Sequence, residues 1–221
     1  EHSDRVQLQA AMASFPLLVE GGVSYCGFNS EKSFGANSFF IEHPDGNWLI
    51  DSPRYIKHLV EVFEQRGGIA HIFLTHKDDV ADADKYAAHF GAERIIHRAD
   101  LDAAPTAEQV IDGEEMVRVG SEFQIIPVPG HTAGSMALLY REQYLFTGDH
   151  LWWDPHTKSL DAPIRLVWKK WTLIDSIRKL LDYRFEWVLA GHGDRVQFPS
   201  ADMRAHLLAL AERREKGSGS R

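Results

Sequence analysis

The chain has 221 residues, of which 44% are hydrophobic and 25% charged, and its formal net charge at pH 7 is −8. This length and apolar content suffice for one large domain with a buried core. The acidic balance argues against nucleic-acid binding, which needs clustered lysines and arginines to displace phosphate counterions. No apolar run reaches the roughly 20 residues that span a bilayer, and the single cysteine, Cys26, excludes an internal disulfide and a cysteine-held metal cluster. We therefore expect a cytoplasmic protein whose partner is a small molecule, with no nucleic acid and no membrane, in an oligomeric state that the sequence leaves open.

The first half of the chain alternates strand-like and helix-like segments. A hairpin is predicted over residues 37–51, because the turn sequence HPDG separates two apolar runs. Apolar residues at helical spacing predict helices over residues 54–66 and 80–90, each followed by glycine. Short apolar runs predict strands on either side of the second helix, over residues 70–76 and 93–97.

The second half shows the same order, with strands first and helices after. Several short apolar runs predict a β-rich block over residues 116–149, and helical spacing predicts a helix over residues 171–181. A closing strand over residues 185–192 precedes a last helix that begins near residue 200. Two similar halves of this kind are expected to form an α/β fold, a four-layer αβ/βα sandwich.

No linker-like segment separates the two halves. We therefore expect a single domain over residues 12–214, preceded by an N-terminal extension over residues 1–11. Residues 215–221 are rich in glycine and serine, which predicts a flexible tail.

Four predicted strands end in a polar residue that can bind metal: His76, His131, Asp149 and His192. A single histidine in such a loop is more often a surface residue than a ligand. Strand ends, however, lie along one edge of a sheet, so side chains that are distant in sequence can converge there. Glycines beside three of the four residues are expected where the backbone turns sharply close to a metal. The pattern predicts one metal site.

The sequences PGHTAGS, LFTGDH and LAGHGD, which contain His131, Asp149 and His192, resemble in order and spacing the motifs of the metallo-β-lactamase superfamily. The resemblance extends from about residue 15 to residue 210 and implies the fold of that family. It implies that His76 and His131 bind a first metal, that Asp149 bridges two metals, and that His192 binds the second. Asp51 matches an aspartate that orients the metals in the family, although a helix cap is an alternative for it.

The sequence THKDDVADAD, which begins at Thr75, departs from the family pattern T-H-x-H-x-D-H. Asp78 stands where the second histidine is expected, and the aspartate-histidine pair has its counterpart two residues late, at Asp82 and Ala83. The sequence THKDDVADAD is similar to the first motif of a subgroup of the superfamily in which this motif is altered to T-H-x-D-D-V-A-D. Carboxylates can replace imidazole as ligands, so we expect Asp78 or Asp79 at the first metal and Asp82 at the second. The alternative is that these aspartates cap and flank the start of the helix that follows.

The resemblance implies a metal-dependent hydrolase in which Asp82 and Asp149 belong to the catalytic centre. Metal-activated water would attack a small ester, thioester, lactone or amide. Because an imidazole is missing at Ala83, we expect one tightly bound metal, zinc or iron with manganese as a further possibility, and a weaker second site. One alternative is an iron protein with a two-histidine, one-carboxylate centre, similar to the sulfur dioxygenases of the superfamily, or a diiron redox protein. Another is a non-catalytic scaffold.

Overall fold

The computed structural model describes residues 14–28, 35–217 and 219. The expected N-terminal extension over residues 1–11 and the last residues of the expected tail lie outside this part of the chain. The chain divides into two compact units, the first formed by residues 1–74 and 78–95 and the second by residues 75–77 and 96–221.

The described strands of the first unit are neighbours in the order in which they occur in the chain. They are β1 (Leu17–Glu20), β2 (Val23–Phe28), β3 (Asn37–Ile41), β4 (Trp48–Ile50), β5 (His71–Phe73) and β6 (Glu93–His97), whose last two residues belong to the second unit. Neighbours from β1 to β4 are antiparallel, whereas β4, β5 and β6 run parallel. The predicted hairpin over residues 37–51 is confirmed as the β3–β4 pair.

Helices connect the parallel strands of the first unit. Helix α2 (Lys57–Gln65) follows β4, and helix α3 (Ala83–Phe90) follows β5. The rings of Phe40, Phe63 and Tyr86, which come from β3, α2 and α3, are buried, and Phe63 lies 4.7 Å from Phe40 and 5.9 Å from Tyr86 between ring centroids. Both helices therefore pack their apolar stripes on the sheet, as the spacing of their apolar residues predicts.

The boundaries of α2 and α3 differ slightly from the sequence prediction. Helix α2 begins at Lys57 because Ile56 before it is still extended, with φ −129° and ψ 145°. Asp51 lies well before this start, so the helix-cap alternative for Asp51 is wrong. Helix α3 ends at Phe90, and the C-cap residue Gly91 has the left-handed φ of 67° that favours glycine at a helix C-terminus.

The second unit contains a mixed sheet whose described strands have the order β15-β14-β11-β10-β9-β8. These are β8 (Val117–Val119), β9 (Phe123–Pro127), β10 (Met136–Tyr140), β11 (Tyr144–Gly148), β14 (Trp187–Ala190) and β15 (Val196–Gln197). All residues of β9, β10 and β11 are buried, which explains their nearly continuous apolar sequence. A separate hairpin of β12 (Trp152–Asp154) and β13 (Ser159–Asp161) and the short strand β7 (Gln109–Ile111) complete the strands of this unit.

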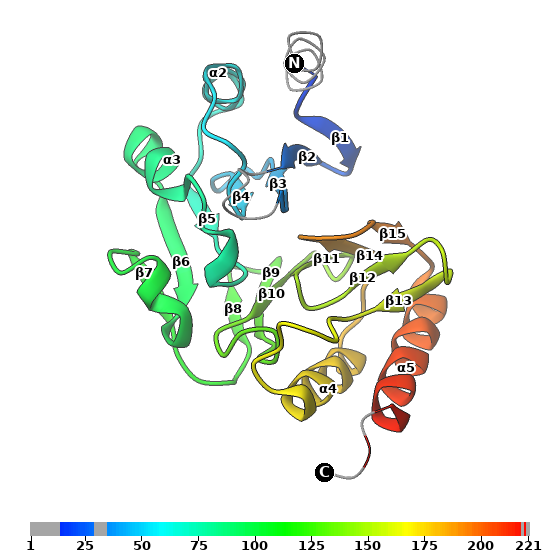
Figure 1. Cartoon of the computed structure of the whole chain (residues 1–221). Coiled ribbons are helices and arrows are strands. Elements are labelled where there is room, and N and C mark those ends of the chain that lie inside the picture. The colour runs from blue at the N-terminus through cyan, green and yellow to red at the C-terminus, as the bar shows by residue number, and fades with distance from the viewer. Residues whose placement is uncertain (1–13, 29–34, 218, 220–221) are drawn as a thin grey trace, which may run out of the picture. The chain divides into compact units, whose positions relative to one another are not determined.

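Helices α4 (Lys170–Lys179) and α5 (Ser200–Lys216) lie side by side in the second unit (Figure 1). Their apolar residues, including Ile177 and Leu207, join those of the sheet, such as Leu139 and Val188, in one core. Helix α5 continues two residues into the segment expected to be a tail, because Glu215 near its end pairs with Arg178 of α4. None of the helices in the described ranges is long and apolar enough to cross a membrane.

Candidate metal centre

Three of the candidate ligands follow strands that point the same way in the sheet of the second unit. Strand β11 is parallel to β14, and β10 is antiparallel to both β9 and β11, so β9, β11 and β14 share one direction. Their carboxyl ends therefore meet at the same edge of the sheet. His131, Asp149 and His192 follow these ends, which explains how residues up to 61 positions apart come together.

His76 reaches the same edge through contacts of Thr75. The amide of Met136, at the start of β10, donates a hydrogen bond of 2.8 Å to the carbonyl oxygen of Thr75. Gly148 has a φ of +50°, and a Cβ atom there would lie 2.3 Å from Thr75 Oγ1. The missing side chain of Gly148 thus makes room for Thr75, and His76 follows directly, with its Nδ1 atom 3.0 Å from Thr75 Oγ1.

The carboxylate of Asp149 lies at the centre of the three histidines. Its Oδ2 atom is 3.7 Å from the Nε2 atoms of both His76 and His131. Its other oxygen, Oδ1, lies 2.6 Å from Nδ1 of His192, within hydrogen-bond distance. The two oxygens of one carboxylate therefore face different histidines.

The donors fit a metal ion. Ligand atoms of His76, His131 and Asp149 all lie within 4.8 Å of one another, and separations of 3.7 Å between nitrogen and oxygen are too long for hydrogen bonds. Two ligands bound to one zinc ion at about 2.0–2.2 Å in tetrahedral geometry lie roughly 3.3 Å apart. Two imidazoles and a carboxylate are also a donor set that suits zinc and iron.

Burial and charge shape the protonation of the centre. Burial by itself would raise the pKa of Asp149, but the hydrogen bond from His192 and the nearby charges of the three histidines hold it below its usual value. His150, the next residue, is almost completely buried, and this burial, together with the nearness of His131, lowers its pKa to about 3. Asp149 is therefore ionised and His150 neutral at pH 7.

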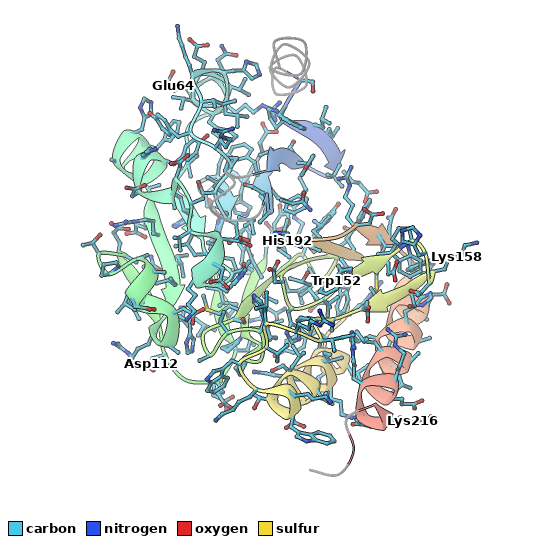
Figure 2. The ribbon with its side chains drawn as sticks, in the orientation of Figure 1. Glu64, Asp112, Trp152, Lys158, His192 and Lys216 are labelled. Carbon is cyan, nitrogen blue, oxygen red and sulfur yellow. The ribbon has the colours of Figure 1, made fainter. Side chains whose placement is uncertain are left out.

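Close backbone packing supports the loops that carry the histidines. A Cβ atom at Gly191 would lie 2.9 Å from Asp149 Oδ1, and one at Gly193 would lie 2.6 Å from the ring of Trp152. Figure 2 labels His192, which lies between these two glycines in the chain, and Trp152. Glycine on both sides of His192 therefore lets this loop approach the carboxylate and the tryptophan closely.

Asp100 connects two of the ligand loops and was not predicted from the sequence. Its side chain is buried, and its Oδ2 atom accepts hydrogen bonds from the Lys77 amide at 3.1 Å and from Thr132 Oγ1 at 2.5 Å. Oδ1 accepts a third bond from the Gly134 amide at 3.1 Å. The residues that follow His76 and His131 are thereby held by one carboxylate. A signal was present, since Asp100 also lies just beyond a strand, β6.

The three aspartates of the altered first motif lie in the first unit. Asp78 is exposed and Asp79 is buried, with 1% of its surface accessible. Asp82 occupies the N-cap position of α3 but makes no capping hydrogen bond. Its carboxylate instead accepts hydrogen bonds from the Tyr55 amide at 2.9 Å and from Lys85 Nζ at 2.6 Å. The roles of Asp78, Asp79 and Asp82 as metal ligands stay predictions.

Asp51, also in the first unit, has an unusual backbone conformation. It is buried and has a φ of 53°, which non-glycine residues seldom adopt. Its amide donates to the carbonyl oxygen of Phe73, at the end of β5, over 2.8 Å. Strain of this kind is found most often near functional sites.

The fold and the histidine-carboxylate cluster define an α/β protein with a candidate metal centre at the carboxyl ends of its strands. Residues 21–210 match the family model of the metallo-beta-lactamase superfamily, and the chain belongs to that superfamily. The predicted family and the metallo-β-lactamase-like α/β fold class are confirmed.

Three similar proteins share between 17% and 34% sequence identity with the chain over the aligned residues. A hydroxyacylglutathione hydrolase of Cereibacter sphaeroides is 34% identical over 123 residues, which are 52% of this chain and 48% of that protein. The chain thus matches about half the length of this curated relative. The crystal structure of DIM-1 metallo-beta-lactamase aligns with a TM-score of 0.67 at 17% identity, over 89% of this chain and 95% of that one. The structure of TTHA1623 in a di-iron-bound form aligns with a TM-score of 0.56 at 23% identity, over 83% and 94%.

Proposed function

We propose that the protein is a metal-dependent hydrolase of a small ester, thioester, lactone or amide. The observation that carries the proposal is the position of Asp149, whose Oδ2 atom lies 3.7 Å from both His76 and His131 while Oδ1 lies 2.6 Å from His192. A carboxylate with histidines on both oxygens suits a bridge between two metal sites. When bound, a divalent ion would lower the pKa of water and polarise the substrate carbonyl.

The residues of the chain have separate tasks in this proposal. His76 and His131 provide imidazole nitrogens for the first metal, and Asp149 offsets the positive charge of the metals because its low pKa keeps it ionised. The additional carboxylate of the first metal is proposed to come from Asp78 or Asp79; of the two, Asp79 is buried and Asp78 is exposed.

The second metal site is proposed to be the weaker one. Although partial burial would raise the pKa of Asp82, its hydrogen bonds with Lys85 and the Tyr55 amide hold it below its usual value. A metal would have to compete with the ammonium group of Lys85 for this carboxylate. His192 and Asp149 would then be the principal remaining protein donors at this site, which favours partial occupancy.

Among the possible substrates we place acyl thioesters first. This choice is supported by the Cereibacter sphaeroides relative, a hydroxyacylglutathione hydrolase, because the bond between an acyl group and glutathione is a thioester. That protein is about twice as long as the matched segment. The proposal therefore specifies neither the acyl group nor the thiol of the substrate. The net charge of −8 supports a small molecule rather than a nucleic acid as the substrate.

The test is hydrolysis of a thioester and of the matched ester and amide by protein loaded separately with zinc, iron or manganese. Metal-dependent turnover of the thioester that is lost in His131→Ala supports the proposal. His156→Ala is a matched control, because His156 is an exposed histidine in the turn between β12 and β13. Protein that binds metal but hydrolyses none of the three substrates contradicts it, and protein that binds no metal indicates a scaffold.

A second candidate is an iron-dependent oxidation. It is favoured by the cluster of His76, His131 and Asp149, since two histidines and one carboxylate are the donor set of mononuclear iron oxygenases. Oxygen consumption by the iron-loaded protein with a thiol substrate, and none with the zinc-loaded protein, would select this function over hydrolysis.

A further inference from the structure

We propose that a cavity between the β12–β13 hairpin and helices α4 and α5 binds the phosphate group of a small phosphate monoester. The cavity has a volume of about 660 Å³ and belongs entirely to the second unit. This volume lies within the range of small-molecule sites. Figure 1 shows β13, α4 and α5 gathered in this part of the unit. None of the residues that line the cavity belongs to the proposed metal centre.

Three cationic side chains and one carboxylate line the cavity. Lys170 is the first residue of α4, Arg213 and Arg214 lie near the end of α5, and Asp161 ends β13. The single carboxylate leaves an excess of two positive charges around the cavity. A phosphate monoester carries a charge of roughly −1.5 to −2 at pH 7 and would balance this excess.

The arginines are held in place before any ligand binds. Arg213 donates from Nη1 to Ser159 Oγ at 3.3 Å and from Nη2 to Asp161 Oδ1 at 3.0 Å. Arg214 donates to the same Asp161 oxygen at 2.6 Å and to the carbonyl oxygen of Ala162. Burial lowers the pKa of Arg214, and the charge of Asp161 opposes this shift without cancelling it. The cavity therefore contains a partly buried cation that would gain from a further anion.

The helix dipole favours the positions of the two arginines but not the position of Lys170. Cations near the C-terminus of α5 interact favourably with the helix dipole, whereas a cation at the first residue of α4 does not. Within the described part of the chain, the ammonium group of Lys170 makes one hydrogen bond, a long one of 3.4 Å to the carbonyl oxygen of Gly217. An ammonium group at this position is well suited to bind an anion in the cavity.

Hydroxyl and apolar groups complete the lining. Thr157 and Ser159 place their hydroxyl oxygens 2.9 Å apart on the hairpin side, and the Thr157 hydroxyl donates to Asp154 Oδ2 at 2.9 Å. Ile164 lines the cavity while 75% of its surface is exposed. An apolar part of the ligand would cover this side chain, so an alkyl phosphate should bind more tightly than inorganic phosphate.

The test is a titration of the zinc-loaded full chain with inorganic phosphate, hexyl phosphate and hexanoate, followed by the backbone amide signals in NMR spectra. We expect hexyl phosphate to shift the amides of Ser159 and Lys170 and to bind more tightly than the other two compounds. Lys170→Gln and Arg213→Gln should each weaken hexyl phosphate binding roughly 10-fold or more, as for the loss of a charged hydrogen bond. Lys57→Gln and Arg184→Gln are matched controls outside the cavity and should leave the affinity unchanged.

Four results would overturn the proposal. The first is an affinity for hexyl phosphate that Lys170→Gln leaves unchanged. This variant decides the matter alone if Arg213→Gln does not fold, because Lys170 is exposed. The second is equal weakening by the control variants, which would indicate nonspecific attraction. The third is hexanoate binding as tightly as hexyl phosphate, which would contradict the match to a doubly charged group. Shifts confined to amides near His131 and Asp149 would assign the phosphate to the metal centre instead. Because none of these readouts is an activity, the outcome is independent of the proposed hydrolase function.

Discussion

The hydroxyl group of Thr132 donates a hydrogen bond of 2.5 Å to the buried carboxylate of Asp100. The same carboxylate also binds the backbone amides of Lys77 and Gly134. One side chain thus positions the loops of His76 and His131, two proposed ligands of one metal. Mutation of residues that support metal ligands in this way typically lowers the metal affinity 10–100-fold.

Asp100→Asn should therefore weaken metal binding roughly 10–100-fold, because the amide retains one acceptor oxygen but loses the charge and one of the two acceptors. The measurement is competition with a chromophoric zinc chelator. Asp112→Asn is a matched control, since Asp112 is exposed and pairs with Arg98. Equal zinc affinities of Asp100→Asn and the unchanged protein would show that the bonds to Asp100 do not position the ligands.

Asp149→Ala should be the most damaging single change at the centre. It removes the oxygen shared by His76 and His131 as well as the partner of His192, so the metal content should fall more than roughly tenfold. Elemental analysis of the purified variant measures this, with Asp154→Ala on strand β12 as the comparison. Retention of the full metal content would rule out a bridging role.

Gly148→Ala should disturb the position of His76. Positive φ at a non-glycine residue costs on the order of 1–3 kcal/mol, and the new Cβ atom would also collide with Thr75, which precedes His76. The variant should have a lower free energy of unfolding and a reduced metal affinity. Gly120→Ala separates the two effects, because Gly120 also has a positive φ, +59°, but has open space around its Cβ position. A metal affinity reduced equally in both variants would contradict this explanation.

Ala83→His would restore the histidine of the family pattern in the sequence, but the structure predicts that it destabilises the protein. Ala83 is the first residue of α3 and is 3% exposed, so an imidazole must displace its neighbours at a cost of about 1–3 kcal/mol. Thermal unfolding should show a lower midpoint for Ala83→His than for Ala88→His, which changes an exposed residue of the same helix. An unchanged midpoint together with a tighter second metal would show that an imidazole fits at this position and binds metal there.

Cys26 should be unreactive in the folded protein. It is 1% exposed in strand β2, and burial raises the pKa of its thiol well above the usual range, although the charge of Arg66 acts in the opposite direction. Because the thiolate is the reactive form, labelling by a thiol reagent at pH 8 should be slow in the native state and complete after unfolding in guanidinium. Rapid labelling of the native protein would show that β2 opens locally.

Several features could be predicted from the sequence because they depend on local patterns. The apolar spacing of α2 and α3 and the turn in the β3–β4 hairpin specify these elements by short-range packing and turn chemistry. The strand-end positions of His131, Asp149 and His192 are also local, since each follows an apolar run directly. These local patterns are sufficient to indicate the family.

Tertiary structure decided which polar groups are partners. No sequence pattern indicates that Asp82 accepts a hydrogen bond from the Tyr55 amide, or that Ala83 is only 3% exposed. Nor does sequence spacing reveal that Asp100, 32 residues before Thr132, binds its hydroxyl group, or that Lys170 and Arg213 line one cavity. Local propensity depends on neighbours a few residues away, whereas the partner of a buried charge is whichever group the packing of distant strands and helices brings within hydrogen-bond distance.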